Sequence, residues 1–233
     1  MKKAFKLFFL LTFLSAHIAW AAPKQIILSY QASRNGKPFA NVVERFEQAN
    51  GQYKIESVTE GVGLAALLGK RVLRSEGLVT DEGLQPKHFE QHQGDNETKS
   101  VYADFDWAAN QLSLKNKGNI KTEALLESTQ DLLSFSYQWI YTSLKDEQFS
   151  LPVTTGKKLR VYRYAVTEQD VNLVTEAGQF KTVHLVSTVA DAKGNEKEFW
   201  LAKDHYYLPV KIVQRDENGS VIEQTLTTIQ VNE

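Results

Sequence analysis

The stretch from Arg45 to Ile55, RFEQANGQYKI, contains the turn that best indicates how this chain folds. Asn50-Gly51 stands at its centre, and a two-residue hairpin turn needs positive φ angles, which Asn and Gly adopt most readily. Counting outward pairs Ala49 with Gln52, Gln48 with Tyr53, Glu47 with Lys54, Phe46 with Ile55 and Arg45 with Glu56. We expect an antiparallel hairpin with an apolar face, while the opposite-charge pairs of the other face add little stability.

Short strands and tight turns recur on both sides of this hairpin. Asn35-Gly36 offers a second turn, and Asp216-Glu217-Asn218-Gly219 separates two strand-like runs near the C-terminus. At the C-terminal turn, a two-residue turn and a three-residue turn with a bulge both fit, and they differ in register by one residue. Val101 to Trp107 alternates apolar and polar residues, as a half-buried strand does. Pro209 interrupts another such run, so we expect it at an edge, a bulge or a strand start.

One long segment breaks the two-residue period. Leu125 to Leu144 spaces its apolar residues three and four apart, and Ser128 to Asp131 supplies residue types that cap helices. We expect a helix that begins near Thr129 and extends to Leu144. The alternative is a strand, because Phe135, Tyr137, Trp139 and Tyr141 also alternate. A helix with apolar residues around most of its circumference must be widely covered, as it would be in the hollow of a curved sheet.

Together these patterns predict a mainly β fold of the α+β kind, in which a curved antiparallel sheet or half-barrel wraps around one main helix. No internal repeat and no Pro/Gly/Ser-rich linker divides the sequence, so residues 22–233 are expected to form a single domain. Lys145 to Leu159 is the expected crossover between the two halves of the sheet.

The N-terminus has the features of a secretory signal peptide. Three lysines precede an apolar run from Leu7 to Ile18, and Ala19-Trp20-Ala21 forms an A-x-A cleavage site. A retained membrane anchor is disfavoured, because the run is shorter than the roughly 20 residues needed to cross a bilayer. We expect residues 1–21 to be cleaved, leaving no transmembrane segment in the mature chain. The mature protein is expected in the bacterial periplasm, with secretion outside the cell as the alternative.

Composition excludes several classes of protein. The 233 residues are 42% hydrophobic and 24% charged, which is typical of a globular protein. Loss of the export segment, which carries three lysines and no acid, changes the formal net charge from −1 to −4. Such a mildly acidic protein lacks the basic face that nucleic acid requires. Because the chain has no cysteine, it has no disulfide, no thiolate metal site and no cysteine that could carry a lipid.

Motifs for catalysis or cofactor binding are weak. Gly61 to Ala66 matches G-x-G-x-x-A, but the strand before it pairs backward through the hairpin instead of entering a parallel sheet. His88 and His92 are four residues apart, which in a strand separates them by roughly 13 Å, too far for one metal ion. Asp104 and Asp106 are typical solvent-exposed strand residues. We therefore expect no enzyme activity, no metal site and no cofactor.

The one candidate binding surface is apolar. It combines VGLAALL at residues 62–68 with the aromatic side chains of the expected helix. Ordinary core packing would explain both features, because aromatic stripes usually pack in cores. The more specific hypothesis is an apolar groove between helix and sheet that holds a lipid or an extended peptide. The candidate ligand-binding residues are Leu64, Leu67, Leu68, Phe105, Trp107, Leu132, Phe135 and Trp139.

Four blocks of the sequence carry a resemblance to a known family. They are SEGLVTDEGLQPKHF (75–89), DFDW (104–107), TQDLLSFSYQW (129–139) and WLAKDHYYLPVKIVQRDENGSVIEQTL (200–226). In these blocks, and in their order, the chain resembles the exported proteobacterial family called "domain of unknown function 3108". The final block is the most specific of the four.

What this resemblance implies is structural. Members of the family are similar to the lipoprotein-localisation factors, in which a half-barrel of antiparallel strands cups a helix around an apolar cavity. The family has no assigned activity, so a function taken from the fold is an analogy. We expect a non-catalytic protein that binds a lipid or a lipidated protein. The alternative is an interaction module in envelope maintenance that docks a protein or glycan partner.

Overall fold

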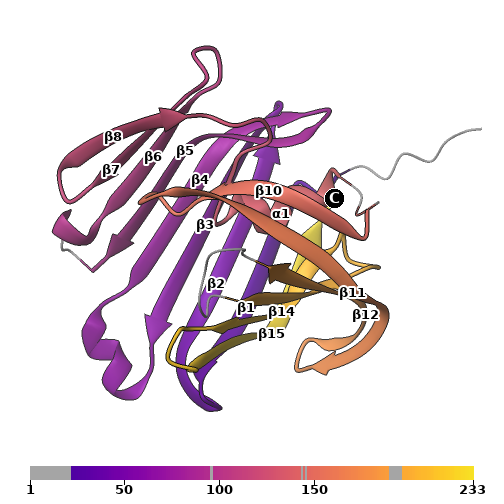
Figure 1. Ribbon diagram of the computed structural model, residues 1–233. Helices are drawn as coiled ribbons and strands as arrows, with labels where there is room; N and C mark the ends of the chain where they lie inside the picture. The colour runs from indigo at the N-terminus through magenta and orange to yellow at the C-terminus, as the bar shows by residue number, and fades with distance from the viewer. Residues whose placement is uncertain (1–21, 95–96, 143, 145, 189–195) are drawn as a thin grey trace, which may run out of the picture.

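The computed structural model describes residues 22–94, 97–142, 144, 146–188 and 196–233. Within these residues the chain forms one 15-stranded sheet, a short helix and three 3-10 turns (Figure 1). The strands are β1 (Gln25–Arg34), β2 (Lys37–Ala49), β3 (Gln52–Gly61), β4 (Arg71–Thr80), β5 (Gly83–Gln93), β6 (Val101–Asp106), β7 (Gln111–Asn116), β8 (Asn119–Ala124), β9 (Gln130–Asp131), β10 (Gln148–Thr154), β11 (Leu159–Thr175), β12 (Gly178–Thr188), β13 (Lys197–Ala202), β14 (Leu208–Arg215) and β15 (Val221–Asn232). The helical elements are η1 (Gly63–Leu68), η2 (Glu97–Lys99), α1 (Ser134–Tyr137) and η3 (Gln138–Ile140). The expected signal peptide, residues 1–21, lies outside the described residues.

The sheet is a mostly antiparallel meander whose first and last strands meet in its middle. Its order runs from β8 down to β1 and then from β15 down to β9. β1 pairs with β15 in antiparallel orientation, while β9 pairs with β10 in parallel. The sheet curls over itself, so that β9 at one end of the sheet lies against β5 in the other half. The Gln130 side chain on β9 donates a hydrogen bond to the Leu84 carbonyl on β5, at 2.9 Å. In Figure 1, β10 and β11 accordingly cross in front of β3 to β5. The expected curved, mainly β fold is confirmed.

The hairpin around Asn50-Gly51 has the expected register in every pair from Ala49–Gln52 to Arg45–Glu56. Both turn residues have positive φ, 52° at Asn50 and 72° at Gly51. The ion pairs on its polar face differ from those counted in the sequence, since Glu56 and Lys54 bind residues of β4 instead of β2. The third strand therefore neutralises the hairpin's charges.

The other turns also follow from their residues. Asn35 and Gly36 have φ angles of 50° and 77° and join Arg34 to Lys37. At the C-terminal turn, the Asp216 amide donates to the Ser220 carbonyl at 3.0 Å, which leaves three residues, Glu217 to Gly219, at the tip. The three-residue alternative is thus the one observed. Pro209 lies where the pairing of β13 with β14 shifts register, so it occupies a bulge, where a missing N–H is tolerated.

The expected helix from Thr129 to Leu144 is wrong in length. Gln130 and Asp131 form strand β9, and helix α1 covers only Ser134–Tyr137 before continuing as the 3-10 turn η3. The Asp131 carboxylate accepts hydrogen bonds from the Leu133 and Ser134 amides at 2.8 and 2.9 Å, but the N-cap of α1 is Leu133, which makes no side-chain capping bond. The helix starts later than expected because Gln130 and Asp131 belong to the sheet as β9.

The expected crossover at Lys145 to Leu159 is also wrong. Residues Gln148–Thr154 of this segment form strand β10, which pairs antiparallel with β11. The connection between the two halves of the sheet is the preceding segment, which holds β9, α1 and η3. Leu151 and Val153 on β10 are buried, so the segment has the burial of a core strand.

The core lies on the concave side of the sheet and includes the helix. Tyr137 of α1 is fully buried and stacks on Phe46 of β2, with ring centroids 5.2 Å apart. Two apolar clusters flank this contact. One is centred on β1 to β6, and the other gathers Phe135 and Trp139 with side chains of β10 to β13. Within the described part of the chain, no helix has both the length and the apolarity needed to cross a membrane.

Candidate functional site

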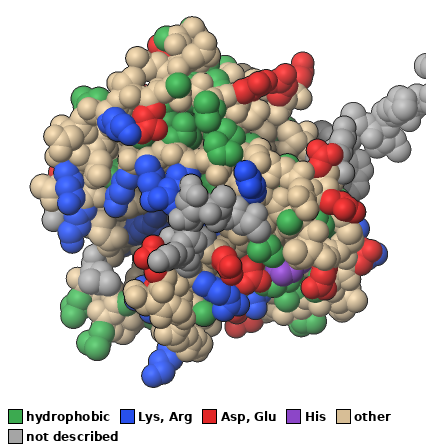
Figure 2. All heavy atoms as spheres, in the orientation of Figure 1, with side chains coloured by type: hydrophobic (Ala, Val, Ile, Leu, Met, Phe, Trp, Pro, Cys, Tyr) green, Lys and Arg blue, Asp and Glu red, His purple; other side chains and the backbone are tan. Residues whose placement is uncertain are grey.

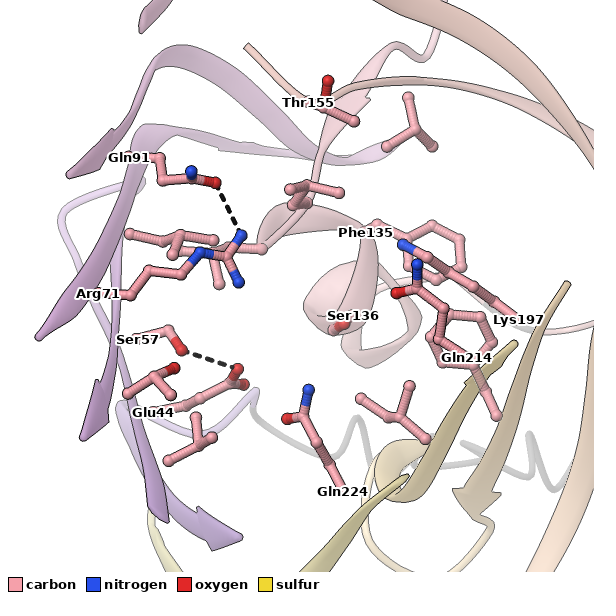
Figure 3. Close-up of a pocket in the computed structure, with 18 of the residues that line it drawn as sticks. Glu44, Ser57, Arg71, Gln91, Phe135, Ser136, Thr155, Lys197, Gln214 and Gln224 are labelled. Atoms are coloured by element: carbon pink, nitrogen blue, oxygen red, sulfur yellow. Dashed lines mark hydrogen bonds between the residues drawn. The ribbon is translucent and has the colours of Figure 1, made fainter. Parts of the chain in front are cut away.

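A cavity of about 480 Å³ lies in the hollow of the sheet, beside α1. Its walls come from strands β2 to β5 on one side and from β10, β11 and β13 to β15 on the other, and residues of α1 lie between them (Figure 3). The fold positions these walls, because the curl of the sheet brings strands distant in sequence to opposite sides of one space. Pockets for small ligands span roughly 300 to 1,000 Å³, so this cavity has room for one.

The apolar part of the lining is an aromatic cluster around Phe135. The Phe135 ring stacks on Tyr164 of β11, with centroids 5.0 Å apart, and lies 5.2 Å from the Phe199 ring of β13. Leu132, Val153 and Ile212 extend the same surface. Of the aromatic side chains predicted to face an apolar groove, Phe135 alone is among the described residues that line the cavity, and Tyr164 and Phe199, which were not predicted, complete the aromatic surface.

A carboxylate on the β2 wall is held by hydroxyl groups. Ser57 donates to Glu44 at 3.2 Å, and Tyr137 donates to the other carboxylate oxygen at 3.2 Å. Burial raises the pKa of Glu44, and the two hydroxyl hydrogen bonds act in the opposite direction. The group is thus bound to its own wall and to α1.

Two cations face the cavity from opposite walls. Arg71 at the start of β4 donates to the Gln91 side chain at 2.7 Å, and Lys197 reaches in from β13 (Figure 3). Burial, and then the positive charge of Arg71, lower the pKa of Lys197 to about 8. On the face seen in Figure 2, Lys and Arg side chains gather around a recess to the left of centre.

Buried hydrogen bonds from Asp131 and Gln138 hold the segment around α1 against strands β4 and β5. Ser75 of β4 donates to the Asp131 carboxylate at 2.6 Å and lies 3.1 Å from the Tyr53 hydroxyl. Burial raises the pKa of Asp131 to about 6, although its hydrogen bonds oppose that rise. A second anchor is Gln138, whose side-chain oxygen accepts from the Leu84 amide at 2.7 Å. These bonds fix the segment that carries Leu132 and Phe135.

The candidate residues named from the sequence are not all in one place. Leu132 and Phe135 line the cavity, and Trp139 packs beside it against Phe149, with ring centroids 5.2 Å apart. Phe105 and Trp107 stack on each other elsewhere, and the Trp107 indole donates to the Pro86 carbonyl at 2.6 Å.

The apolar segment VGLAALL does not reach the cavity. Leu64 and Leu67 of η1 are 87% and 85% exposed, and neither lines it. The side chain of Leu68 lies outside the described part of the structure. Strand β3 before this segment is antiparallel to both neighbours, and η1 is a 3-10 turn. The G-x-G-x-x-A match therefore lacks the parallel strand and α-helix of a dinucleotide site.

The polar residues of the cavity were missed by the sequence reading. Arg71 shares the inward parity of Leu73 and Ser75, and Lys197 that of Phe199 and Leu201, all four of which are buried. A basic residue in register with buried positions of a strand is a signal that the sequence contains. Clustering of apolar residues, by contrast, does not identify Arg71 and Lys197.

His88 and His92 of β5 lie on the outer face of the sheet, away from the cavity. His88 contacts Asp104 at 2.6 Å, and His92 contacts Glu90 at 3.2 Å. Among the described residues, no group of three or more His, Cys, Asp and Glu side chains is arranged to hold a metal ion. These side chains contact carboxylates on a surface distinct from the cavity.

A solved structure has a fold similar to that of this chain. The chain is similar to a beta-barrel-like protein of domain of unknown function DUF1849 from Brucella abortus, with a TM-score of 0.60 and 12% identity over 91% of this chain and 100% of that one. A structure described as a "putative lipoprotein" from Parabacteroides distasonis matches with a TM-score of 0.35 and 11% identity, covering 89% of this chain and 95% of that one. No curated protein matches the chain.

A family model covers most of the sequence. The model described as "Protein of unknown function (DUF3108)" matches residues 29–227, a range that includes every strand from β2 to β14 and both walls of the cavity. The resemblance noted in four blocks of the sequence thus extends over most of the sheet. This chain belongs to the DUF3108 family.

Proposed function

We propose that this DUF3108 protein is an exported, non-catalytic binding protein that holds a lipid, or the lipid of a lipidated protein, in the cavity beside α1. The observation that carries this proposal is the 480 Å³ cavity itself, one part of which is lined by Phe135, Tyr164 and Phe199. Aromatic side chains at the edge of a cavity offer an apolar ligand a large contact area.

The N-terminal sequence supports the location. A basic start, an apolar run and an A-x-A site precede the first strand, as in proteins exported to the periplasm. A lipid cannot cross an aqueous compartment unless its chains are shielded from water. An exported protein with an apolar recess could supply that shield.

The first experiment asks whether the protein carries a lipid. The full chain is produced in bacteria with its own N-terminus, released from the periplasm without detergent and studied by native mass spectrometry. We expect a co-purified lipid, or uptake of an added fluorescent fatty acid. If the protein contains no lipid and takes up no fatty acid, the proposal is wrong and the docking-module alternative takes its place.

A matched pair of variants tests whether the cavity is the binding site. The Ser136 side chain of α1 faces the cavity (Figure 3), so Ser136→Trp fills it. Thr122→Trp adds the same bulk to an exposed position of β8. We expect Ser136→Trp to abolish fatty acid uptake and Thr122→Trp to leave it unchanged. Equal uptake by the two variants would place the ligand elsewhere.

A further inference from the structure

Two arginines on strand β4, Arg74 and Arg71, have side-chain partners of different charge. Arg74 faces outward from β4 and forms ion pairs with Glu56 and Glu90, both at 2.9 Å. Arg71, three residues earlier, faces the cavity, and its one side-chain partner among the described residues is the neutral amide of Gln91. Buried cations are normally paired with carboxylates, because an unpaired buried charge is costly. Arg71 departs from that rule.

Lys197 on the opposite wall has the same deficiency. Its ammonium group forms no ion pair with any carboxylate in the described part of the chain. The charge that acts on its pKa is the positive charge of Arg71. Burial together with this like charge lowers its pKa to about 8. Two cations that repel each other in a recess create a site that an anion would stabilise.

Glu44, the one carboxylate among the described residues of the lining, does not fill this role. Glu44 accepts hydrogen bonds from Ser57 and Tyr137, and it forms no ion pair with Arg71 or Lys197. Lys157 also lines the cavity, so that among the described residues of the lining three cations stand against one acid. The lining therefore carries an excess of positive charge, although the whole sequence has a formal net charge of −1.

The cations and the aromatic surface belong to one cavity. Lys197 and Phe199 are two residues apart on β13 and point to the same side of the strand, so a cation borders the apolar part of the lining. We propose that the ligand is an amphiphile with an anionic head, a carboxylate or a phosphate, held between Arg71 and Lys197 while its apolar chain lies against Phe135 and Phe199. This inference rests on the proposed function and names its ligand class.

The test compares ligands that share one chain and differ in the head. Dodecanoate, dodecyl phosphate, neutral dodecanol and inorganic phosphate each compete with 1-aminoanthracene, a neutral fluorophore that reports apolar binding. We expect dodecanoate or dodecyl phosphate to bind at least about tenfold more tightly than dodecanol, since a hydrogen bond to a charged group is stronger than one between neutral groups. The better of the two charged ligands identifies a carboxylate or a phosphate head.

Variants then locate the head. Arg71→Gln and Lys197→Gln should each weaken the better charged ligand about tenfold, and together about 100-fold, while dodecanol binding stays unchanged. Arg71→Lys should restore part of the affinity. Arg74→Gln removes the same group from the same strand on the outer face, so it serves as the control and should bind like the wild type.

The outcomes separate this inference from the proposed function. If neither the fluorophore nor any dodecyl compound binds, the proposed function fails and the inference with it. If dodecanol competes as well as the charged ligands, or if the double variant binds them like the wild type, the headgroup does not contribute to binding. The cavity then still binds a lipid, and the inference alone is overturned. Inorganic phosphate binding as tightly as dodecyl phosphate would make the site one for a free anion and would also overturn it.

Discussion

The hairpin of β2 and β3 and the internal segment from Thr129 to Thr142 are held by different kinds of contact. The hairpin's pairs surround a two-residue turn and lie close in sequence. The internal segment depends on partners far away, since Ser75 binds Asp131 over 56 residues and Leu84 binds Gln138 over 54. The residues of a turn determine the structure of the hairpin, whereas contacts with the curled sheet determine the structure of the internal segment.

This difference explains why one expectation was correct and the other was not. A two-residue turn with positive φ fixes the register of both strands that leave it. Apolar residues three and four apart favour a helix but do not set its length, because tertiary contacts override propensity. In this protein the pairing of β9 with β10 takes Gln130 and Asp131 into the sheet and so shortens the helix. Both structures border the cavity, the hairpin through Glu44 and Ser57 and the internal segment through Leu132 and Phe135.

The largest expected effect comes from breaking the contact between the internal segment and the sheet. Phe135→Ala removes a 4% exposed ring that packs on Tyr164 and Phe199. We expect the free energy of unfolding to fall by about 3–5 kcal/mol, as for other buried Phe→Ala changes. Chemical denaturation measures this loss. Val174→Ala at a 74% exposed position is the control, with a change below about 0.5 kcal/mol.

A pair of glycine substitutions compares the two regions directly. Gly51 in the hairpin turn and Gly83 at the start of β5 both have positive φ, 72° and 110°. A Cβ on Gly51 meets nothing within 4 Å, whereas one on Gly83 would lie 2.5 Å from the Gln138 amide nitrogen. Alanine at either site brings a backbone strain of roughly 1–2 kcal/mol.

At Gly83 the loss should be larger, about 3–4 kcal/mol, because displacing Gln138 also removes the hydrogen bond to the Leu84 amide. Urea denaturation of Gly51→Ala and Gly83→Ala gives both values. Equal losses would mean that Gln138 does not anchor the internal segment to the sheet.

The smallest expected effect is the pH dependence of the Asp131 anchor. Its pKa is about 6 in the folded protein, against about 4 for an unfolded Asp. Between these values the native state keeps a proton that the unfolded chain releases, so this contribution to stability is full below pH 4 and is lost as the pH rises through 6. A shift of about two units corresponds to about 2–3 kcal/mol.

Asp131→Asn isolates this contribution, because the amide cannot titrate. We expect the stability difference, wild type minus variant, to decrease by about 2–3 kcal/mol between pH 4 and pH 7. Glu44 also has a raised pKa, but it is present in both proteins and cancels in the difference. Parallel stability curves across this range would show that Asp131 does not titrate with a raised pKa.

The strands and their register followed from the sequence because their signals are local. Alternation predicted the buried face of β6, where Val101, Ala103 and Phe105 are buried, and the Asn-Gly turns predicted two hairpins. Two outcomes were outside the reach of these signals. β9 is two residues long and pairs in parallel, and β10 was read as a connection. Both depend on how far the sheet curls.

The candidate site was only partly accessible to sequence reasoning. Leu132 and Phe135 were named for their apolar pattern and do line the cavity, but Leu64 and Leu67 share that pattern and lie exposed. Hydrophobicity alone does not tell a cavity wall from a surface turn. Arg71 and Lys197 were overlooked because they lie 126 residues apart and only the closed curl of the sheet brings them to one space.

The sequence by itself determined the antiparallel pairing, the register of the main hairpin and the inward face of strands such as β6, because turn geometry and side-chain alternation act over a few residues. The tertiary structure decided the length of the helix, the course of the chain from β9 to β10 and the composition of the cavity. Those features arise where strands distant in sequence meet, and the free energy that selects them comes from long-range burial and hydrogen bonding.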